Sequence, residues 1–191
     1  MDGNVVEAIK QQLIRPERVW SRAEVASRPC PVPKIPGVYA WYFREIPGEI
    51  PIAGCNTFED LTLLYVGISR AFPTSKRTLR TRIKTHYRPR GRSTLRRSLG
   101  CLLEERLDLK IAAQPGGKSF YYGDTEEILS DWMGQNAFVV WSEHPQPWEV
   151  ESSLIKTVSL PLNINHNKTH AHCASLQALR ADARTRVKLL S

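Results

Sequence analysis

Three short apolar runs along the chain predict three short strands. Residues 37–43 (GVYAWYF), 63–69 (LLYVGIS) and 137–141 (AFVVW) are apolar runs rich in β-branched and aromatic side chains. In the first run both alternating sets of side chains are apolar, so we expect other elements to cover both faces of that strand. Residues 44–60 contain several prolines and glycines, and this composition favours a long loop.

Apolar residues at helical spacing predict helices around these strands. A capping box at Ser21 favours a short helical turn, Thr78 is the expected start of another helix, and Pro147 suits a first helical turn. A further short strand is expected at 109–111. The predicted helices cover residues 5–14, 79–87, 94–107, 125–133, 148–158 and 175–190.

These elements suit one α+β domain in a chain of 191 residues, with a small, mostly antiparallel three-stranded sheet flanked by helices. Residues 1–34 are expected to form an N-terminal arm laid over the main domain, and its proline-rich part is extended. The main domain spans residues 35–165. Residues 166–191 are expected to form a basic helical tail packed on the same domain.

The charged residues favour a polyanionic partner. The chain has 27 Lys and Arg against 19 Asp and Glu, a formal net charge of +8. Such an excess favours nucleic acid first and an anionic membrane surface second. The densest basic stretch and the basic terminal helix would hold a nucleic-acid backbone without reading its sequence. The arginines of that stretch are Arg88, Arg90, Arg92, Arg96 and Arg97.

Several other classes of protein are disfavoured. No run approaches about 18 apolar residues, and no signal peptide is visible, so we expect a cytoplasmic protein without a membrane span. The sequence Gly117-Lys118-Ser119 lacks the glycine that a phosphate-binding loop needs five positions earlier, because Ala112 stands there. A zinc site in the tail is disfavoured because no second cysteine lies near its candidate ligands, His166, His170, His172 and Cys173.

Two tripeptides and a downstream helix resemble the signature of a known family. Gly37-Val38-Tyr39 lies on the first predicted strand, Tyr65-Val66-Gly67 lies on the second, and a helix with arginine follows. Far downstream, Glu151 stands twelve positions before Asn163, with Leu-Ile-Lys between them. In this order the parts resemble the GIY-YIG nuclease superfamily, over about residues 35–165.

The chain departs from the family's usual pattern at two places. Tyr39 and Tyr65 are 26 positions apart, where the family usually joins the two strands by a tight hairpin. The chain therefore carries an insertion, which surface loops tolerate at modest entropic cost. Ile68 stands where some members have a lysine, so that helper for proton transfer is absent.

The resemblance implies catalytic roles for four polar residues. Tyr39 would act as the base and Tyr65 would orient water and substrate, although the sequence leaves the two roles interchangeable. Arg82 would bind the phosphate as a bidentate donor, and His86, one helical turn later, would hydrogen-bond the nucleophile or the phosphate. Arg80 is the alternative to Arg82, but it points in a different direction from His86.

The resemblance also implies a metal ligand, Glu151, which would anchor Mg²⁺ or Mn²⁺ through carboxylate oxygen. Glu149 is the nearby rival, but residues two apart on a helix are separated by about 200° and cannot face one site. Gly37, Gly67 and Asn163 would support the site. Gly67 would allow close approach of the chain to the site or form a bulge, and the asparagine would either brace the adjoining loop by hydrogen bonds or simply end the helix.

The function expected from this resemblance is metal-dependent hydrolysis of nucleic-acid phosphodiesters by an endonuclease. DNA is favoured over RNA because most of the relatives it resembles cut DNA. The alternative is a non-catalytic nucleic-acid-binding module on the same fold. The joint presence of Tyr39, Tyr65, Arg82 and Glu151 favours the enzyme, because a module without activity would be expected to lack at least one of them.

Overall fold

The computed structural model describes residues 3–89, 93–114 and 119–189, and in these residues the central sheet has four antiparallel strands. Their order across the sheet is β2 (Thr57–Phe58), β3 (Leu61–Ile68), β1 (Gly37–Phe43) and β6 (Ala137–Glu143). The α+β class is confirmed, but the expectation of three strands was wrong. The additional strand, β2, has two residues and lies in the stretch predicted to be a loop, where it is too short to show a period.

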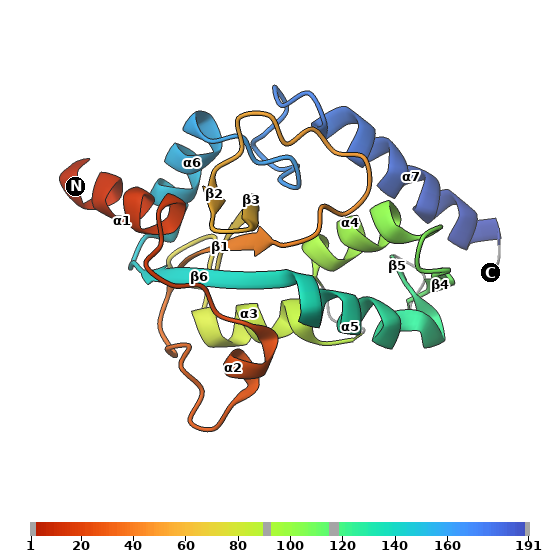
Figure 1. Cartoon of the computed structure of the whole chain (residues 1–191), viewed down its shortest axis with the longest axis horizontal. Helices are drawn as coiled ribbons and strands as arrows, with labels where there is room; N and C mark the ends of the chain where they lie inside the picture. The colour runs from red at the N-terminus through yellow and green to blue at the C-terminus, as the bar shows by residue number, and fades with distance from the viewer. Residues whose placement is uncertain (1–2, 90–92, 115–118, 190–191) are drawn as a thin grey trace.

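Helices cover both faces of this sheet (Figure 1). On one face lie α1 (Gly3–Ile14) and α6 (Pro147–Thr157), and on the other lie α2 (Arg22–Ala26), α3 (Leu79–Tyr87) and α5 (Glu126–Asn136). Beside the second layer, α4 (Thr94–Leu103) packs against the long C-terminal helix α7 (Cys173–Leu189). The six long predicted helices are present, although the helix expected over 94–107 ends at Leu103.

The central strand β1 is buried over its whole length, as its two apolar faces predicted. Tyr39, Trp41 and Phe43 face the layer of α3 and α5, while Val38, Ala40 and Tyr42 face α1 and α6. β1 pairs along its full length with β6 and along the opposite edge with β3. The site residue Tyr39 is therefore fixed in the middle of the molecule.

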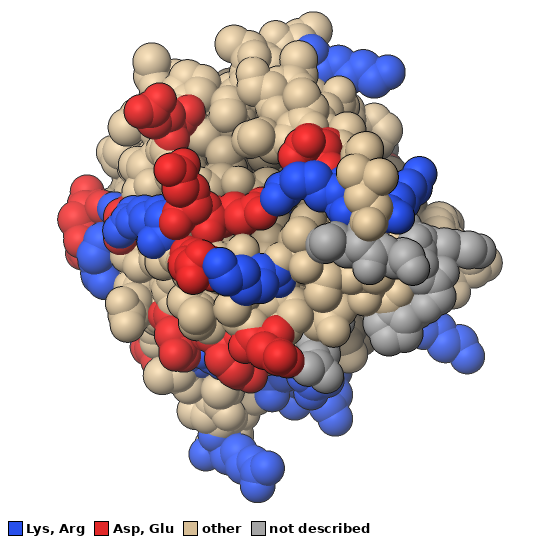
Figure 2. Space-filling model, turned by 90° about the vertical axis from the view of Figure 1, so that its right-hand side faces the viewer, with Lys and Arg blue, Asp and Glu red and all other residues tan. Residues whose placement is uncertain are grey.

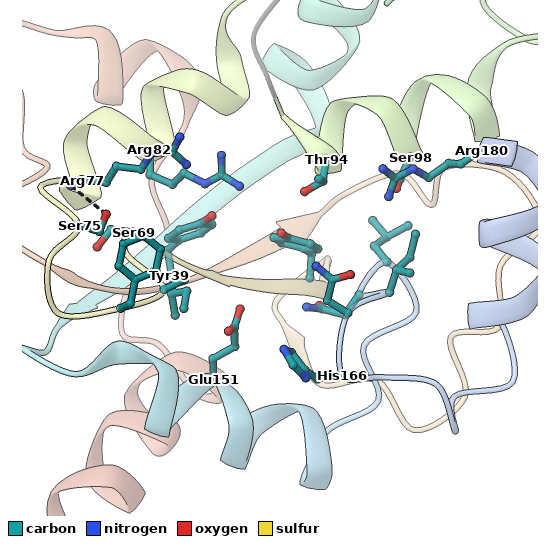
Figure 3. Close-up of a pocket in the computed structure, with 18 residues that line it drawn as sticks. Tyr39, Ser69, Ser75, Arg77, Arg82, Thr94, Ser98, Glu151, His166 and Arg180 are labelled. Atoms are coloured by element: carbon teal, nitrogen blue, oxygen red, sulfur yellow. Dashed lines mark hydrogen bonds between the residues drawn. The ribbon is translucent and has the colours of Figure 1, made fainter. Parts of the chain in front are cut away.

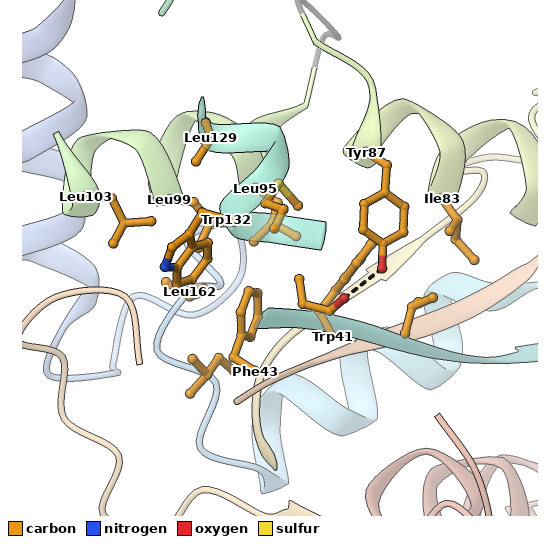
Figure 4. Close-up of a cluster of buried hydrophobic side chains, with 14 of the residues drawn as sticks. Trp41, Phe43, Ile83, Tyr87, Leu95, Leu99, Leu103, Leu129, Trp132 and Leu162 are labelled. Atoms are coloured by element: carbon orange, nitrogen blue, oxygen red, sulfur yellow. Dashed lines mark hydrogen bonds between the residues drawn. The ribbon is translucent and has the colours of Figure 1, made fainter. Parts of the chain in front are cut away.

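Large aromatic side chains fill the core between the sheet and the second helical layer (Figure 4). The Phe43 ring stacks on Trp132, with 6.2 Å between the ring centroids, and Trp41 meets Tyr87 edge to face at 4.9 Å. The Tyr87 hydroxyl donates a hydrogen bond of 2.8 Å to the carbonyl of Ala137, at the start of β6. These contacts anchor α3 and α5 on the sheet, and α3 carries Arg82 and His86.

The N-terminal residues are held against the sheet at several points. The Tyr42 hydroxyl donates to the carbonyl of Leu13 at 2.8 Å, and Trp20 forms a β-bridge with Val139 of β6. Ser21 caps α2 with the predicted capping box. The described residues of the N-terminal arm (residues 1–34) thus contact the main domain.

A second, two-stranded sheet connects α4 to α5. It consists of β4 (Ala112–Ala113) and β5 (Phe120–Tyr121), and the short 3₁₀ helix Gly123–Thr125 follows. The strand expected at 109–111 lies instead at residues 112–113. Its position is fixed by pairing with β5, which the short apolar run at 109–111 could not predict. Tyr122, which follows β5, is buried against Gly100 of α4.

Two helical glycines provide a test of this packing. A Cβ atom at Gly100 would lie 2.0 Å from Cε2 of the Tyr122 ring, whereas one at Gly134 would meet only the flexible Arg22 side chain at 3.4 Å. Gly134→Ala should therefore raise the free energy of unfolding by about 0.5–1 kcal/mol through helix propensity. Gly100→Ala should lower it by about 1–3 kcal/mol, because overpacking outweighs the same propensity gain.

Chemical denaturation of both variants and the wild type would measure these changes. If Gly100→Ala were as stable as Gly134→Ala, the close packing of Tyr122 on α4 would be wrong.

Candidate active site

A pocket of about 500 Å³ opens beside β3 and collects side chains from both helical layers (Figure 3). β2 pairs only with the first residues of β3, so the rest of the outer edge of β3 has no strand beside it among the described residues. At this edge the layer of α3 and the layer of α6 approach each other. The polar residues that line the pocket there include Tyr39, Tyr65, Arg82, Glu151 and Asn163.

The two tyrosines come from adjacent strands and point toward the same pocket. Tyr39 lies opposite Gly67 across the β1–β3 pair, and Tyr65 is two residues from Gly67 on the same strand. A Cβ atom at Gly67 would lie 2.6 Å from the Tyr39 hydroxyl oxygen and 2.7 Å from its Cζ atom. The missing side chain thus creates the space that the Tyr39 ring occupies, which is the close approach expected of this glycine.

His86 lies behind Tyr39 rather than in the pocket. Its side chain is fully buried, its Nε2 atom is 2.8 Å from the Tyr39 hydroxyl, and its Nδ1 atom is 2.7 Å from the Ser93 hydroxyl. Both ring nitrogens are therefore engaged. The structure differs here from the expectation that His86 contacts the nucleophile or the phosphate, because this histidine orients Tyr39 instead.

Arg82 and Arg80 point in different directions, as their positions on α3 predicted. Arg80 donates to the carbonyls of Val32 and Cys30 and so holds the N-terminal arm. Arg82 lines the pocket, and a hydrogen bond with it influences the pKa of Tyr39. Of the two, Arg82 is the one placed to receive a ligand.

Glu151 and Glu149 are likewise separated by the geometry of their helix. Glu151 projects from α6 into the pocket, toward the two tyrosines, whereas Glu149 is in the first turn and does not line it (Figure 3). Burial raises the pKa of the Glu151 carboxyl to about 7, although the positive charge of Arg82 lowers it. Among the described residues, no hydrogen bond or ion pair is found for this carboxylate, so its oxygens are open to a ligand.

Asn163 closes the free edge of β3. Its amide nitrogen donates to the Val66 carbonyl, and its amide oxygen accepts from the Val66 N–H, each at 2.8 Å. The N–H of Leu162 donates to the carbonyl of Leu64 at 3.0 Å. Asn163 therefore substitutes for a neighbouring strand and ties the segment after α6 to the strand that carries Tyr65.

Gly37 connects the two strands at the other end of the site. Its N–H donates to the Ser69 hydroxyl at 2.9 Å, and its carbonyl accepts from the Ser69 N–H at 2.9 Å. This reciprocal pair fixes the end of β3 and the loop that follows, which contributes Ser75 and Arg77 to the pocket wall.

Burial sets the protonation of the aromatic groups at the site. It raises the pKa of the Tyr39 phenol well above its ordinary value near 10, Tyr65 adds to the rise, and Arg82 opposes it. Burial also raises the pKa of Tyr65, against hydrogen bonding by Thr94 and the charge of Arg82. Burial lowers the pKa of His86 well below its ordinary value, as do the charges of Arg82 and Arg96. At neutral pH both phenols are protonated and the imidazole is neutral.

The donor set suits a cation of the magnesium type. Magnesium takes one or two carboxylates, keeps several waters and shares oxygens with a substrate phosphate. Glu151 supplies one unpaired, largely buried carboxylate beside an open pocket. Among the described residues no group of three or more His, Cys, Asp or Glu could hold a metal by itself, so the pocket has no zinc-type ligand cage.

The five arginines expected to bind a nucleic-acid backbone have different surroundings. Arg88 is exposed directly after α3, and Arg97 is partly buried and donates to Ser119. The prediction that Arg96 binds nucleic acid was wrong, because this residue is 2% exposed and forms an ion pair with Glu126 inside the protein. Arg96 therefore holds α4 against α5 and cannot reach a ligand. Arg90 and Arg92, the other two predicted arginines, lie outside the described residues.

Sequence reasoning missed several residues of the pocket wall. Thr94 and Ser98 come from α4, and Arg180 comes from α7 (Figure 3). His166, named in the sequence only as a disfavoured zinc ligand, also lines the pocket, from the loop between α6 and α7. The tail was expected to be basic, but helical periodicity gave no reason to single out Arg180. Its place at the site follows from the packing of α7 against α4.

The raised pKa of Glu151 predicts a pH-dependent gain in stability for Glu151→Gln. The folded protein holds this proton up to about pH 7, whereas an unfolded chain releases it near the ordinary glutamate pKa of 4.5. Wild type therefore loses stability as pH rises between these values, and the neutral glutamine does not. At pH 8 the variant should be more stable than wild type by about 1–3 kcal/mol, after allowance for partial solvent screening.

Thermal unfolding in EDTA at pH 5 and pH 8 would measure this effect, with Glu149→Gln as the control from the same helix. The advantage of Glu151→Gln should grow with pH, and that of Glu149→Gln should stay nearly constant. Equal differences at the two pH values would show that the Glu151 carboxylate is not held in a desolvated site.

Comparison with known proteins agrees with this arrangement. A family model described as the GIY-YIG catalytic domain matches residues 37–182, which include every pocket element from β1 to most of α7. No curated protein and no solved structure matches the chain. No helix in the described residues is long and apolar enough to cross a membrane. Since the family model covers most of the sequence, this chain belongs to the family of GIY-YIG catalytic domains, which have a nuclease fold.

Proposed function

We propose that this protein is a metal-dependent endonuclease that hydrolyses phosphodiester bonds of DNA. One observation supports this proposal above all others. Tyr39, Tyr65, Arg82 and Glu151 come from four different elements, β1, β3, α3 and α6, and all line one pocket. A core or a solvated helix face gives no reason for such a meeting of phenols, guanidinium and carboxylate.

Arg82 is proposed to bind the scissile phosphate. Its planar guanidinium can donate two parallel hydrogen bonds to phosphate oxygens, and its charge offsets the charge that develops there. Arg82 lines the same pocket as both phenols, and its charge lowers the pKa of each tyrosine. A phosphate bound at Arg82 would therefore lie within reach of the groups that move protons.

Tyr39 is proposed as the base and Tyr65 as the residue that orients water and substrate. In the free protein the Tyr39 phenol is protonated, so before it can act as a base it must release its proton to water in the pocket, after the substrate and cation have bound. A neutral His86 that accepts a hydrogen bond from the phenol through Nε2 would leave the lone pairs of the Tyr39 oxygen directed to Arg82 and the pocket. This arrangement would orient the oxygen before reaction.

Glu151 is proposed to hold Mg²⁺ or Mn²⁺. A bound cation of this type polarises a phosphoryl oxygen and stabilises the leaving oxygen. The carboxylate must be deprotonated to act as a ligand, so cation affinity should rise with pH up to about 7, the pKa of Glu151, and then level off. Arg82, across the pocket, favours that ionised form.

Loss of the Glu151 carboxylate should abolish cleavage while binding persists. Supercoiled plasmid would be incubated at low salt with wild type, Glu151→Ala or Glu149→Ala, in Mg²⁺, Mn²⁺ or EDTA. Wild type and Glu149→Ala should nick the plasmid only with a cation. Glu151→Ala should be at least about 100-fold slower, a loss typical of a removed charge-stabilising group.

The same experiment separates the enzyme from a non-catalytic binding module. If wild type bound plasmid in a salt-sensitive manner but never nicked it, hydrolysis would be rejected in favour of the module. If Glu149→Ala abolished nicking and Glu151→Ala did not, the proposed metal ligand would be wrong.

A further inference from the structure

We propose that Arg180, with Thr94 and Ser98, forms a second phosphate site in the pocket, flanked by Arg97 of α4 and by Arg184, one turn beyond Arg180 on α7, and that this site binds a neighbouring phosphate of the strand held at Arg82. This inference rests on the proposed function and extends it from a single scissile phosphate to the path of the nucleic-acid backbone. It assigns a substrate-positioning role to the C-terminal helix α7, which carries Arg180 and Arg184.

Arg180 reaches the pocket from α7 and ends beside the first residues of α4 (Figure 3). Its guanidinium shares the pocket wall with the hydroxyls of Thr94 and Ser98. The buried Nε atom of Arg180 has no hydrogen-bond partner in the described part of the chain. A guanidinium beside two hydroxyls, with a donor left unpaired, is a suitable environment for an oxyanion.

No carboxylate neutralises this arginine cluster within the described residues. Neither Arg97 nor Arg180 nor Arg184 forms an ion pair there, whereas Arg186, two residues beyond Arg184 on the same helix, is paired with both Glu104 and Asp182. Arg97 donates only to the uncharged oxygens of Ser119 and Ser93. Three cations of α4 and α7 thus remain available for an anionic ligand.

The arginines of the cluster lie close enough to influence one another. Burial lowers the pKa of Arg180, and the charge of Arg184 lowers it further. Burial also lowers the pKa of Arg97, followed by the charges of Arg180, Arg184 and Arg82. Like charges that are partly removed from water repel one another, and a bound anion would relieve that repulsion.

Arg180 and the scissile-phosphate residue Arg82 line the same pocket at different places, and Figure 3 shows Thr94 between them. The charges of both arginines also influence the pKa of Tyr65, which lines the same pocket. Two separate cationic positions in one pocket suit two phosphates of one strand. The backbone would therefore run along the pocket from Arg77 and Arg82 toward Arg180.

In Figure 2, acidic and basic side chains are intermingled on the side of the molecule that carries the C-terminal end of the chain. The ion pairs Arg186–Glu104 and Lys110–Asp108 belong to this end of the fold. Arg180, by contrast, lines the pocket and forms no ion pair among the described residues.

Binding of a fluorescein-labelled DNA single strand of about 12 nucleotides would test this proposal, since such strands span one binding site. Anisotropy would be followed in EDTA over a range of salt, so that affinity is measured without metal-dependent cleavage. Arg180→Gln should weaken binding about tenfold at low salt, by loss of a charged hydrogen bond. It should also reduce the slope of log K against log salt by about 0.7, the value for one phosphate contact on a single strand.

Three further variants complete the test. Arg180→Lys should restore the salt slope, because it keeps the charge, and only part of the affinity, because it lacks the bidentate fork. Arg184→Gln, at an exposed position where misfolding is not expected, should also reduce the slope. The control Arg15→Gln removes an exposed arginine directly after α1, at the opposite side of the molecule, and should change neither quantity appreciably (Figure 1).

Affinities and slopes for Arg180→Gln and Arg184→Gln equal to those of Arg15→Gln would overturn the proposal, as would the absence of salt-sensitive binding by wild type. Hydrolysis is judged separately by the plasmid assay. A protein that shows the Arg180 effect but never cuts would retain the phosphate site and lose the nuclease function. A protein that cuts without the Arg180 effect would retain only the nuclease function.

Discussion

A strand edge inside a protein cannot leave its N–H and C=O groups without partners, and this requirement places the candidate site beside β3. β2 satisfies only the beginning of that edge. Farther along, the amide of Asn163 and the N–H of Leu162 take the place of a strand. These bonds draw the segment after α6 onto the sheet, and so they fix the helix that carries Glu151. The carboxylate of one helical layer thereby lies in the same pocket as the phenols of the sheet and the guanidinium of the other helical layer.

Burial then determines the chemistry of the groups that meet there. The same removal from water raises the pKa of Tyr39 and of Glu151 and lowers that of His86. The resting site thus holds neutral phenols and a neutral imidazole, and its remaining carboxylate is close to its midpoint at neutral pH. The burial of the Glu151 carboxylate destabilises the folded protein, and a bound cation would offset this loss of stability. Such a site is organised for a charged ligand, since its own charges are incompletely paired.

Local patterns and family resemblance together predicted the three longest strands, most helix positions and the residues that line the pocket at its centre. The apolar runs identified β1 and β3, and the spacing of Glu151 and Asn163, which matches the family's pattern, singled out two residues that line the same pocket. The features that were not predicted depend on contacts between distant parts of the chain. β2 forms because it pairs with β3, and its two residues are too few to show an alternating pattern. Arg96 is buried because it pairs with Glu126, which is thirty positions away in the sequence. Helical spacing put His86 on the same face as Arg82, but only the depth of the core shows that it lies behind Tyr39.

The contrast between Arg96 and Arg180 explains why a count of basic residues could not locate the binding surface. Both are arginines on helices beside the pocket, and both are largely removed from water. Arg96 has a carboxylate partner, so its charge is used within the fold. Arg180 has other arginines as its neighbours, so its charge must be balanced from outside. The net charge of +8 therefore matters less for its size than for the positions of the individual arginines, and Arg180 is placed in the pocket beside β3.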